Sequence, residues 1–190
     1  TEARLMAERD GKTEITFPPE LLAQENANSK VKDSLDTQRR LFAARHEALV
    51  GQINVLNQKI AQSGEEIRGL REQTTSASRQ IELLNQEITV VEGLLKTGNA
   101  VRPRLLALQR QQADIAGQRG NAQAMSSRAE QTINESKINI INIKNDFLNK
   151  VVAELQETQT QVASHEEQAR ATSDVVRRID ITAPIDGIVT

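Results

Sequence analysis

The sequence predicts a mainly α protein: a long antiparallel coiled-coil α-hairpin, with a short helical segment before it and the start of a small β domain after it. Two runs of heptads, separated by one short break, support this prediction. Apolar spacing that alternates three and four residues indicates a coiled-coil seam. The break holds Pro103, the only proline between Glu20 and Ala183. A reversal of the chain at this break would fold the two runs against each other.

The apolar residues of the first run occupy the a and d positions of the heptad. The a positions are Ile53, Ile60, Ile67, Ile81, Ile88 and Leu95, and the d positions are Leu35, Phe42, Leu49, Leu56, Leu70, Leu84 and Val91. After the break the pattern resumes at Leu105, Leu108, Ile115, Ile133, Ile140, Ile143 and Phe147. The outward faces are rich in Gln, Asn and Ser, and we identify no second seam on them.

Helix start and stop signals divide the helical part of the chain in two. Residues 1–27 are predicted to hold the end of a preceding helix, a connector and a short helix. Residues 28–177 are predicted to form the α-helical hairpin, with its tip near residues 97–103. Gly98 suits the position just after the first long helix, and Pro103 suits the first turn of the second. At about 1.5 Å per residue, each arm is on the order of 100 Å long.

The pattern changes from helix to strand after residue 177. Ile179, Ile181 and Ala183 alternate with polar residues, and the segment from Pro184 to Gly187 has the composition of a turn. Residues 178–190 are therefore predicted to begin a small β domain.

Composition excludes several functional classes. Only 37% of the 190 residues are hydrophobic and 2% are aromatic, which argues against a wide globular core. Lys and Arg number 24 against 26 Asp and Glu, so the basic field that attracts nucleic acid is missing. Cysteine is absent, which excludes disulfides, thiolate catalysis and cysteine metal sites in this chain. We therefore expect no nucleic-acid partner.

No residue pattern indicates catalysis or a bound cofactor. There is no glycine-rich phosphate loop, and neither His46 nor His165 has a strong second metal ligand at helical spacing. The paired carboxylates Glu65-Glu66 and Glu166-Glu167 are adjacent, and adjacent residues do not share a helix face. We expect no enzyme activity, no metal and no cofactor.

The tip of the hairpin is the predicted partner-binding site, formed by Leu95, Gly98, Val101, Arg102 and Arg104. The two arginines stand at the start of a helix, where the helix dipole disfavours positive charge by about 0.3–1 kcal/mol each. Leu95 and Val101 add apolar groups near an exposed end. This combination predicts docking on an acidic protein surface, and the alternative that two arginines in a hydrated loop carry no function stays open.

The chain resembles a known family. The terminal segment from Arg177 to Val189, with Ala183-Pro184 and Gly187, is similar to the second half of a lipoyl-like domain in periplasmic adaptor subunits, where a long α-hairpin splits that domain. The resemblance is to the HlyD family of membrane fusion proteins of type I secretion systems, nearest the adaptors that export proteases and lipases. The other matching residues are Phe17-Pro18-Pro19, Gln38, Leu41, Phe42, Arg45, Leu49, Gly51, Gln52, Leu94 to Gly98, Arg104 to Leu108, and Arg110.

This resemblance implies the periplasmic domain of an inner-membrane-anchored protein, with the anchor outside these residues. It implies an inner-membrane ABC transporter and a TolC-like outer-membrane channel as partners, with the hairpin tip on the channel. It also implies a homo-oligomer, a hexamer in the assembled complex. It implies no cofactor, because no modifiable lysine occupies the turn from Pro184 to Gly187.

Other interpretations stay open. A structural coiled-coil scaffold would explain the heptads but not the segment from Ala183 to Gly187. A carrier domain of a biotin- or lipoate-dependent enzyme would explain that segment but not the two long arms. A drug-efflux adaptor of the same superfamily carries Arg, Leu and Ser at its tip with the spacing R-x3-L-x6-S. Only Leu95 agrees with that motif here, because Val91 and Arg102 occupy the other two positions.

Overall fold

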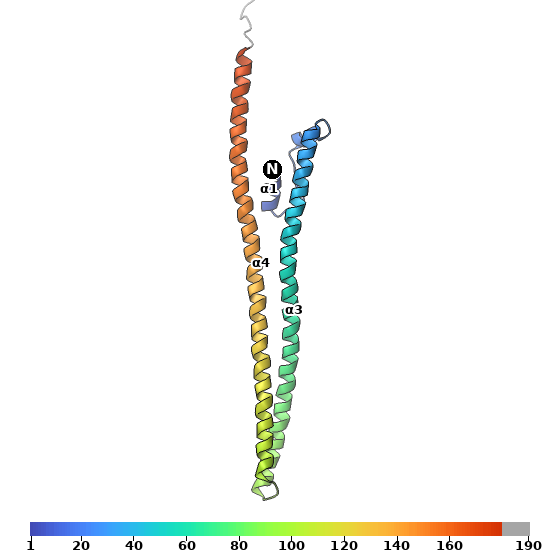
Figure 1. The fold of residues 1–190 in the computed structure, drawn as a ribbon, viewed down its shortest axis with the longest axis vertical. Helices are drawn as coiled ribbons and strands as arrows, with labels where there is room; N and C mark the ends of the chain where they lie inside the picture. Colours follow the sequence, from blue (N-terminus) through green and yellow to red (C-terminus); the bar gives the residue numbers. More distant parts are fainter. Residues whose placement is uncertain (180–190) are drawn as a thin grey trace, which may run out of the picture. The chain divides into compact units, whose positions relative to one another are not determined.

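The structure, a computed structural model, describes residues 1–179, with side chains up to Arg177. Within these residues there is no strand, and the helices are α1 (Glu2–Arg9), α2 (Pro19–Glu25), α3 (Ser29–Lys96) and α4 (Arg102–Ile179) (Figure 1). The predicted helical hairpin is confirmed as α3 and α4. Helix α4 continues two residues beyond the predicted end at residue 177, so Ile179 is helical and does not begin a strand. The predicted β segment beyond it, residues 180–190, lies outside the described part of the chain.

The helix ends follow the local chemistry of the sequence. Helix α1 stops before Gly11, which has a φ of 64° and so takes a conformation that favours glycine. Helix α2 begins with Pro19, whose missing N–H is not needed there. The side-chain Oδ1 of Asn28 accepts a hydrogen bond of 3.0 Å from the backbone N–H of Lys30 at the start of α3. Asn28 therefore acts as a capping residue.

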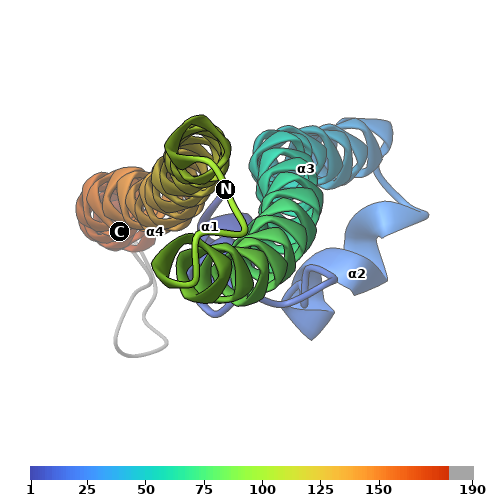
Figure 2. The ribbon, with the colours of Figure 1, turned by 90° about the horizontal axis from the view of Figure 1, so that it is seen from below.

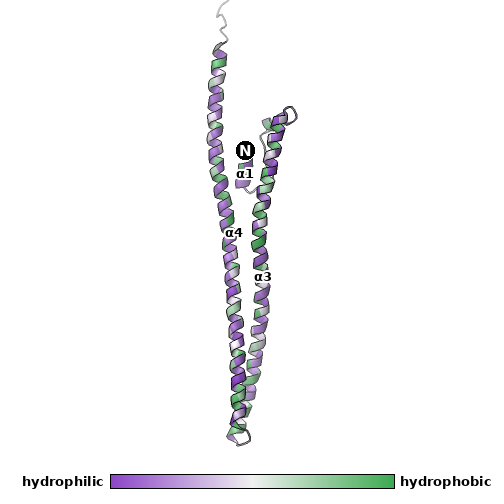
Figure 3. Cartoon of the chain, viewed as in Figure 1, coloured by the Kyte–Doolittle hydropathy of each residue, from purple (hydrophilic) through white to green (hydrophobic). Residues whose placement is uncertain are grey.

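The chain forms two compact units, and α3 and α4 pass through both. The first unit comprises residues 1–49 together with the chain from residue 144 onward, and the second comprises residues 50–143. Along both long helices, hydrophobic positions recur among hydrophilic ones (Figure 3). This pattern is typical of a narrow seam between two helices.

In the second unit the predicted heptads form the seam. Its buried cluster comprises Ala77, Leu84, Val91, Leu108 and Ile115, with Ile81, Ile88, Ala100 and Leu105 packed against it. Further from the tip, Ser63, Ala122, Ala129 and Ser136 are also buried. The Oγ of Ser136 donates to the carbonyl of Thr132 at 2.8 Å, which satisfies its polar group inside the seam.

In the first unit, α1 lies between α3 and α4 (Figures 1 and 2). Leu5 is 0% exposed and packs against Val151 and Leu155, with Phe147 beside them. The heptad pattern predicts a two-helix seam here, but the structure has three helices. Because α1 supplies the apolar side chain, Val151 and Leu155 of α4 are buried.

Buried charges connect α1 to both long helices. The guanidinium of Arg4 pairs with Glu8 at 2.7 Å, and its Nε donates to Oε1 of Gln38 on α3 at 2.9 Å. Nη1 of Arg45, also on α3, donates to Oε2 of Glu154 on α4 at 2.8 Å, and its Nε lies 3.5 Å from Oε2 of Glu8. Arg4 and Glu8 are both buried. Breaking one buried pair would leave an uncompensated charge, so this cluster fixes the position of α1.

We predict opposite effects for alanine at two glycines. Gly98, at the tip, has a φ of 78° with open space around its Cβ position, so Gly98→Ala should lower stability by about 1–2 kcal/mol through backbone strain alone. Gly117 lies within α4, also with open space, so Gly117→Ala should raise stability by about 0.5–1 kcal/mol. Thermal unfolding followed by circular dichroism measures both. Equal shifts in Tm would contradict the assigned backbone conformations.

We predict that acid weakens the first unit through Glu154. The hydrogen bond from Arg45 holds the pKa of the Glu154 carboxyl below its ordinary value of 4.5. A depressed folded-state pKa adds stability above the ordinary value, and this stability is lost as the pH falls through the folded-state pKa. Glu154→Gln should therefore reduce the drop in Tm between about pH 7 and about pH 3. The matched control is Glu166→Gln, an exposed carboxylate on the same helix, which should leave that drop unchanged.

Candidate docking surface at the hairpin tip

The tip is a short, hydrogen-bonded reversal between α3 and α4. The backbone N–H of Gly98 donates to the carbonyl of Leu95 at 3.2 Å, and that of Asn99 donates to the carbonyl of Leu94 at 2.9 Å. These two bonds, with the positive φ of Gly98, form a Schellman motif that closes α3. The hydroxyl of Thr97 adds a bond of 3.0 Å to the same Leu94 carbonyl. The turn is therefore ordered by its own backbone and needs no partner to hold it.

The predicted site residues share this turn but differ in exposure. Val101 is 68% exposed, and Arg102 follows it as the first residue of α4, also exposed. Leu95 is half-buried, so only part of its side chain is available to a partner. Gly98 is exposed and serves the turn through its backbone. The apolar group that the tip presents most fully is Val101.

The two arginines are not equivalent. Arg104 forms an ion pair with Glu87 of α3, so its charge is already neutralised within the hairpin. Arg102 has no ion-pair partner among the described side chains. The sequence-based hypothesis counted two free positive charges at the tip. The structure leaves Arg102 as the charge that is free to meet an acidic surface.

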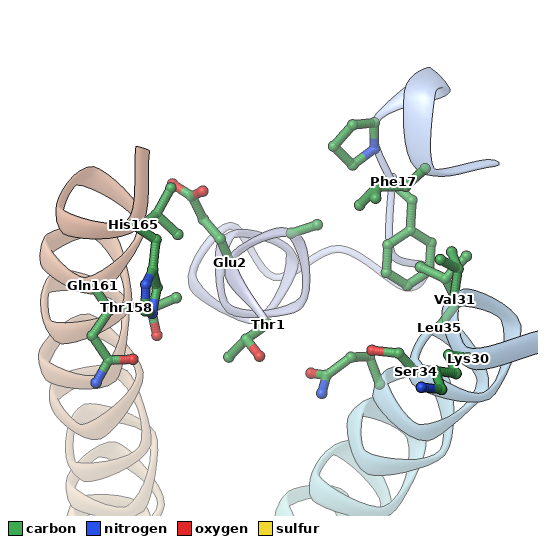
Figure 4. A pocket seen from close by; sticks show the side chains of 15 residues that line it. Thr1, Glu2, Phe17, Lys30, Val31, Ser34, Leu35, Thr158, Gln161 and His165 are labelled. Atoms are coloured by element: carbon green, nitrogen blue, oxygen red, sulfur yellow. The ribbon is translucent and has the colours of Figure 1, made fainter. Parts of the chain in front are cut away.

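A second concave site lies in the first unit, beside the start of α1. It is a groove of about 560 Å³ between α1 and the two long helices (Figure 4). Apolar side chains of Phe17, Val31 and Leu35 form one wall, and His165 lies on the other. Across the described residues, no three His, Cys, Asp or Glu side chains are grouped to hold a metal ion.

Sequence reasoning missed one exposed apolar surface, on the outer face of α4. We call it the outer stripe, and it consists of Ile138, Ile141, Asn145, Leu148 and Val152. All five residues are exposed, although four are large and apolar. These residues are separated by three, four, three and four positions, and this spacing could have revealed the stripe in the sequence. It was hidden because the inward heptad residues alternate with them along the chain.

The comparisons with known proteins agree with this architecture. The family model described as AprE, long alpha-helical hairpin, matches residues 1–175. The type I secretion system membrane fusion protein PrsE of Rhizobium meliloti (strain 1021) is 31% identical over 185 residues, which cover 97% of this chain and 42% of PrsE. The alkaline protease secretion protein AprE of Pseudomonas aeruginosa is 27% identical over 188 residues, covering 99% of this chain and 43% of AprE. The chain thus spans less than half the length of these relatives.

A solved structure has the same fold. The crystal structure of the soluble domain of LipC, a membrane fusion protein of a type I secretion system, superposes with a TM-score of 0.89 at 27% identity. The match covers 98% of this chain and 86% of that one. Among the described residues of our chain, no helix has the length and apolar character that a membrane span requires. PrsE and LipC are both named as membrane fusion proteins of type I secretion systems, and the chain belongs to the AprE long α-helical hairpin family.

Proposed function

We propose that the protein is a non-enzymatic periplasmic adaptor for type I protein secretion. In this proposal it links an inner-membrane ABC transporter to a TolC-like outer-membrane channel, and several parallel copies, six in the assembled complex, surround the path of the exported protein. An anchor in the inner membrane lies outside these residues, and the segment that follows α4, residues 180–190, begins the second half of a lipoyl-like domain. The relatives named as type I secretion membrane fusion proteins support this role.

The observation that carries the docking proposal is the exposed tip. Val101 is 68% exposed and stands beside the unpaired Arg102, on a turn that its own hydrogen bonds order. A preordered apolar and basic tip loses little conformational entropy on binding, which favours affinity. The partner surface should offer an apolar pocket for Val101 and a carboxylate for Arg102.

The length of the helices suits this role. Helix α3 has 68 residues, so its path measures on the order of 100 Å at about 1.5 Å per residue. Such a helix can carry a docking tip far from a membrane-proximal contact. A structural scaffold would use the same helices, but it would not need an exposed Val101 and Arg102 at the reversal.

Cross-linking in cells tests the partner. The chain contains no cysteine, so Val101→Cys introduces a single reactive thiol into it. With a short thiol-to-amine cross-linker, we expect a product that contains the outer-membrane channel. The control is Asn121→Cys, an exposed position on the side of α4 in the same unit, which should give much less of this product. Equal yields from both positions would contradict docking through the tip.

Charge reversal tests the role of Arg102. In a chain that also carries Val101→Cys, Arg102→Glu should reduce the yield of the cross-linked product by about tenfold or more, and Arg102→Glu should reduce substrate export by a similar factor. Losing the ion pair with the partner and placing a like charge beside its carboxylate costs more than about 1.4 kcal/mol of binding free energy. Arg119→Glu reverses an exposed charge elsewhere on α4 and should change neither. Circular dichroism should show the same helix content in both variants. Export unchanged in Arg102→Glu would overturn the proposed contact.

A further inference from the structure

A short apolar stripe follows one side of α3 just before the tip. Leu83 is 64% exposed, Val90 is 62% exposed and Leu94 is 42% exposed. These residues are seven and four positions apart, so they share one face of the helix. The buried seam residues Leu84 and Val91 lie on a different face of the same turns. We call Leu83, Val90 and Leu94 the tip stripe, and all three belong to the second unit.

An ion pair lies within the tip stripe and neutralises the charge there. Glu87 is on the same face of α3, and its carboxylate pairs with Arg104 of α4. A partner that covers the stripe therefore meets no uncompensated charge. The opposite side of the hairpin at this level is polar, because Asn85 accepts a hydrogen bond from Gln112. The two sides of the hairpin thus differ, and the apolar side carries the tip stripe.

The spacing of the tip stripe indicates an α-helix as its occupant. With Leu83 and Val90 at a positions, Glu87 and Leu94 fall at d positions. Side chains at a and d insert between those of one facing helix. From Leu83 to Leu94 the stripe extends about 16 Å, or about three turns. A helix with its own apolar a and d residues over the same length would cover it.

The tip stripe ends abruptly, and this limit indicates the kind of partner. The heptad positions further from the tip on the same face are Gln80, Ser76, Gln73 and Gly69, none of which is a large apolar residue. The first three line a groove of about 410 Å³ between α3 and α4. A neighbouring parallel copy of this chain would lie along the whole side of the hairpin and would need apolar positions there as well. The occupant therefore contacts α3 only beside the tip, as a helix that arrives from beyond the tip does.

We propose that the tip stripe binds an amphipathic α-helix of the same partner that receives the tip. This inference rests on the proposed function, in which that partner is the outer-membrane channel. It adds that a channel helix overlaps the side of α3 over about three turns, so that docking is not only end to end. The apolar face of that helix covers the tip stripe, while Val101 and Arg102 bind beyond the overlap.

Cross-linking from the tip stripe tests the overlap. Val90→Cys introduces a single thiol into the chain. Labelled with a thiol-reactive benzophenone in cells that express the complete protein, it should capture the channel. The matched control is Glu92→Cys, an exposed position at the same level but on another face of α3, which should capture much less. Equal capture from the two positions, or capture of a second copy of this chain in place of the channel, would overturn the inference.

The Val101→Cys cross-link separates this inference from the proposed function. Capture of the channel from both Val101→Cys and Val90→Cys supports the overlap. Capture from Val101→Cys alone would leave docking through the tip intact and would overturn the overlap. Loss of capture from both positions would overturn the proposed docking and the overlap with it.

A charge in the tip stripe tests its energetic role. In a chain that also carries Val101→Cys, Val90→Lys should lower the yield of the channel product by about tenfold or more, because the partner helix would bury an unpaired charge in place of an apolar group. The control Thr89→Lys places the same charge on an exposed face of α3 away from the stripe and should leave the yield unchanged. Circular dichroism should show the same helix content in both variants. An unchanged yield in Val90→Lys would contradict the overlap.

Discussion

The heptad register between α3 and α4 is the constraint on which the rest of the structure depends. A seam only one or two side chains wide buries little area at any one level, so stability comes from repetition along the helices. Each turn of α3 must meet the correct turn of α4, and the reversal at the tip sets that alignment. The hydrogen bonds from Gly98 to Leu95 and from Asn99 to Leu94 therefore help to set the register of the two helices as well as to form the turn.

Much of the fold could be predicted because its signals are local. The positive φ of Gly98, the capping oxygen of Asn28 and the position of Pro19 at a helix start each depend on a few neighbouring residues. The position of α1 could not be predicted in this way. Leu5 meets Val151 and Leu155 at a sequence separation that no heptad pattern reports. Arg4 and Glu8 have the spacing of an ordinary surface pair, yet both are buried.

The candidate site was predicted in outline for the same reason. Exposed residues at a break between two helices indicate a tip, and the structure has Val101 and Arg102 there. The pairing of Arg104 with Glu87 depends on how the two helices face each other, which sequence spacing alone did not give. The outer stripe was missed because its residues are interleaved with those of the seam: Ile141 is 56% exposed, whereas its neighbour Ile140 is half-buried. A search for one periodic face per helix assigns such a segment to the inward face only.

The insertion of α1 also has a consequence for the order in which the protein folds. The α3–α4 seam can close stepwise from the tip, because each added level brings together residues already near each other. Leu5 cannot reach Val151 until the chain has been made and folded through most of both long helices. Synthesis runs from the N-terminus, so α1 emerges first among these elements. Helix α1 is therefore synthesised first but is buried last.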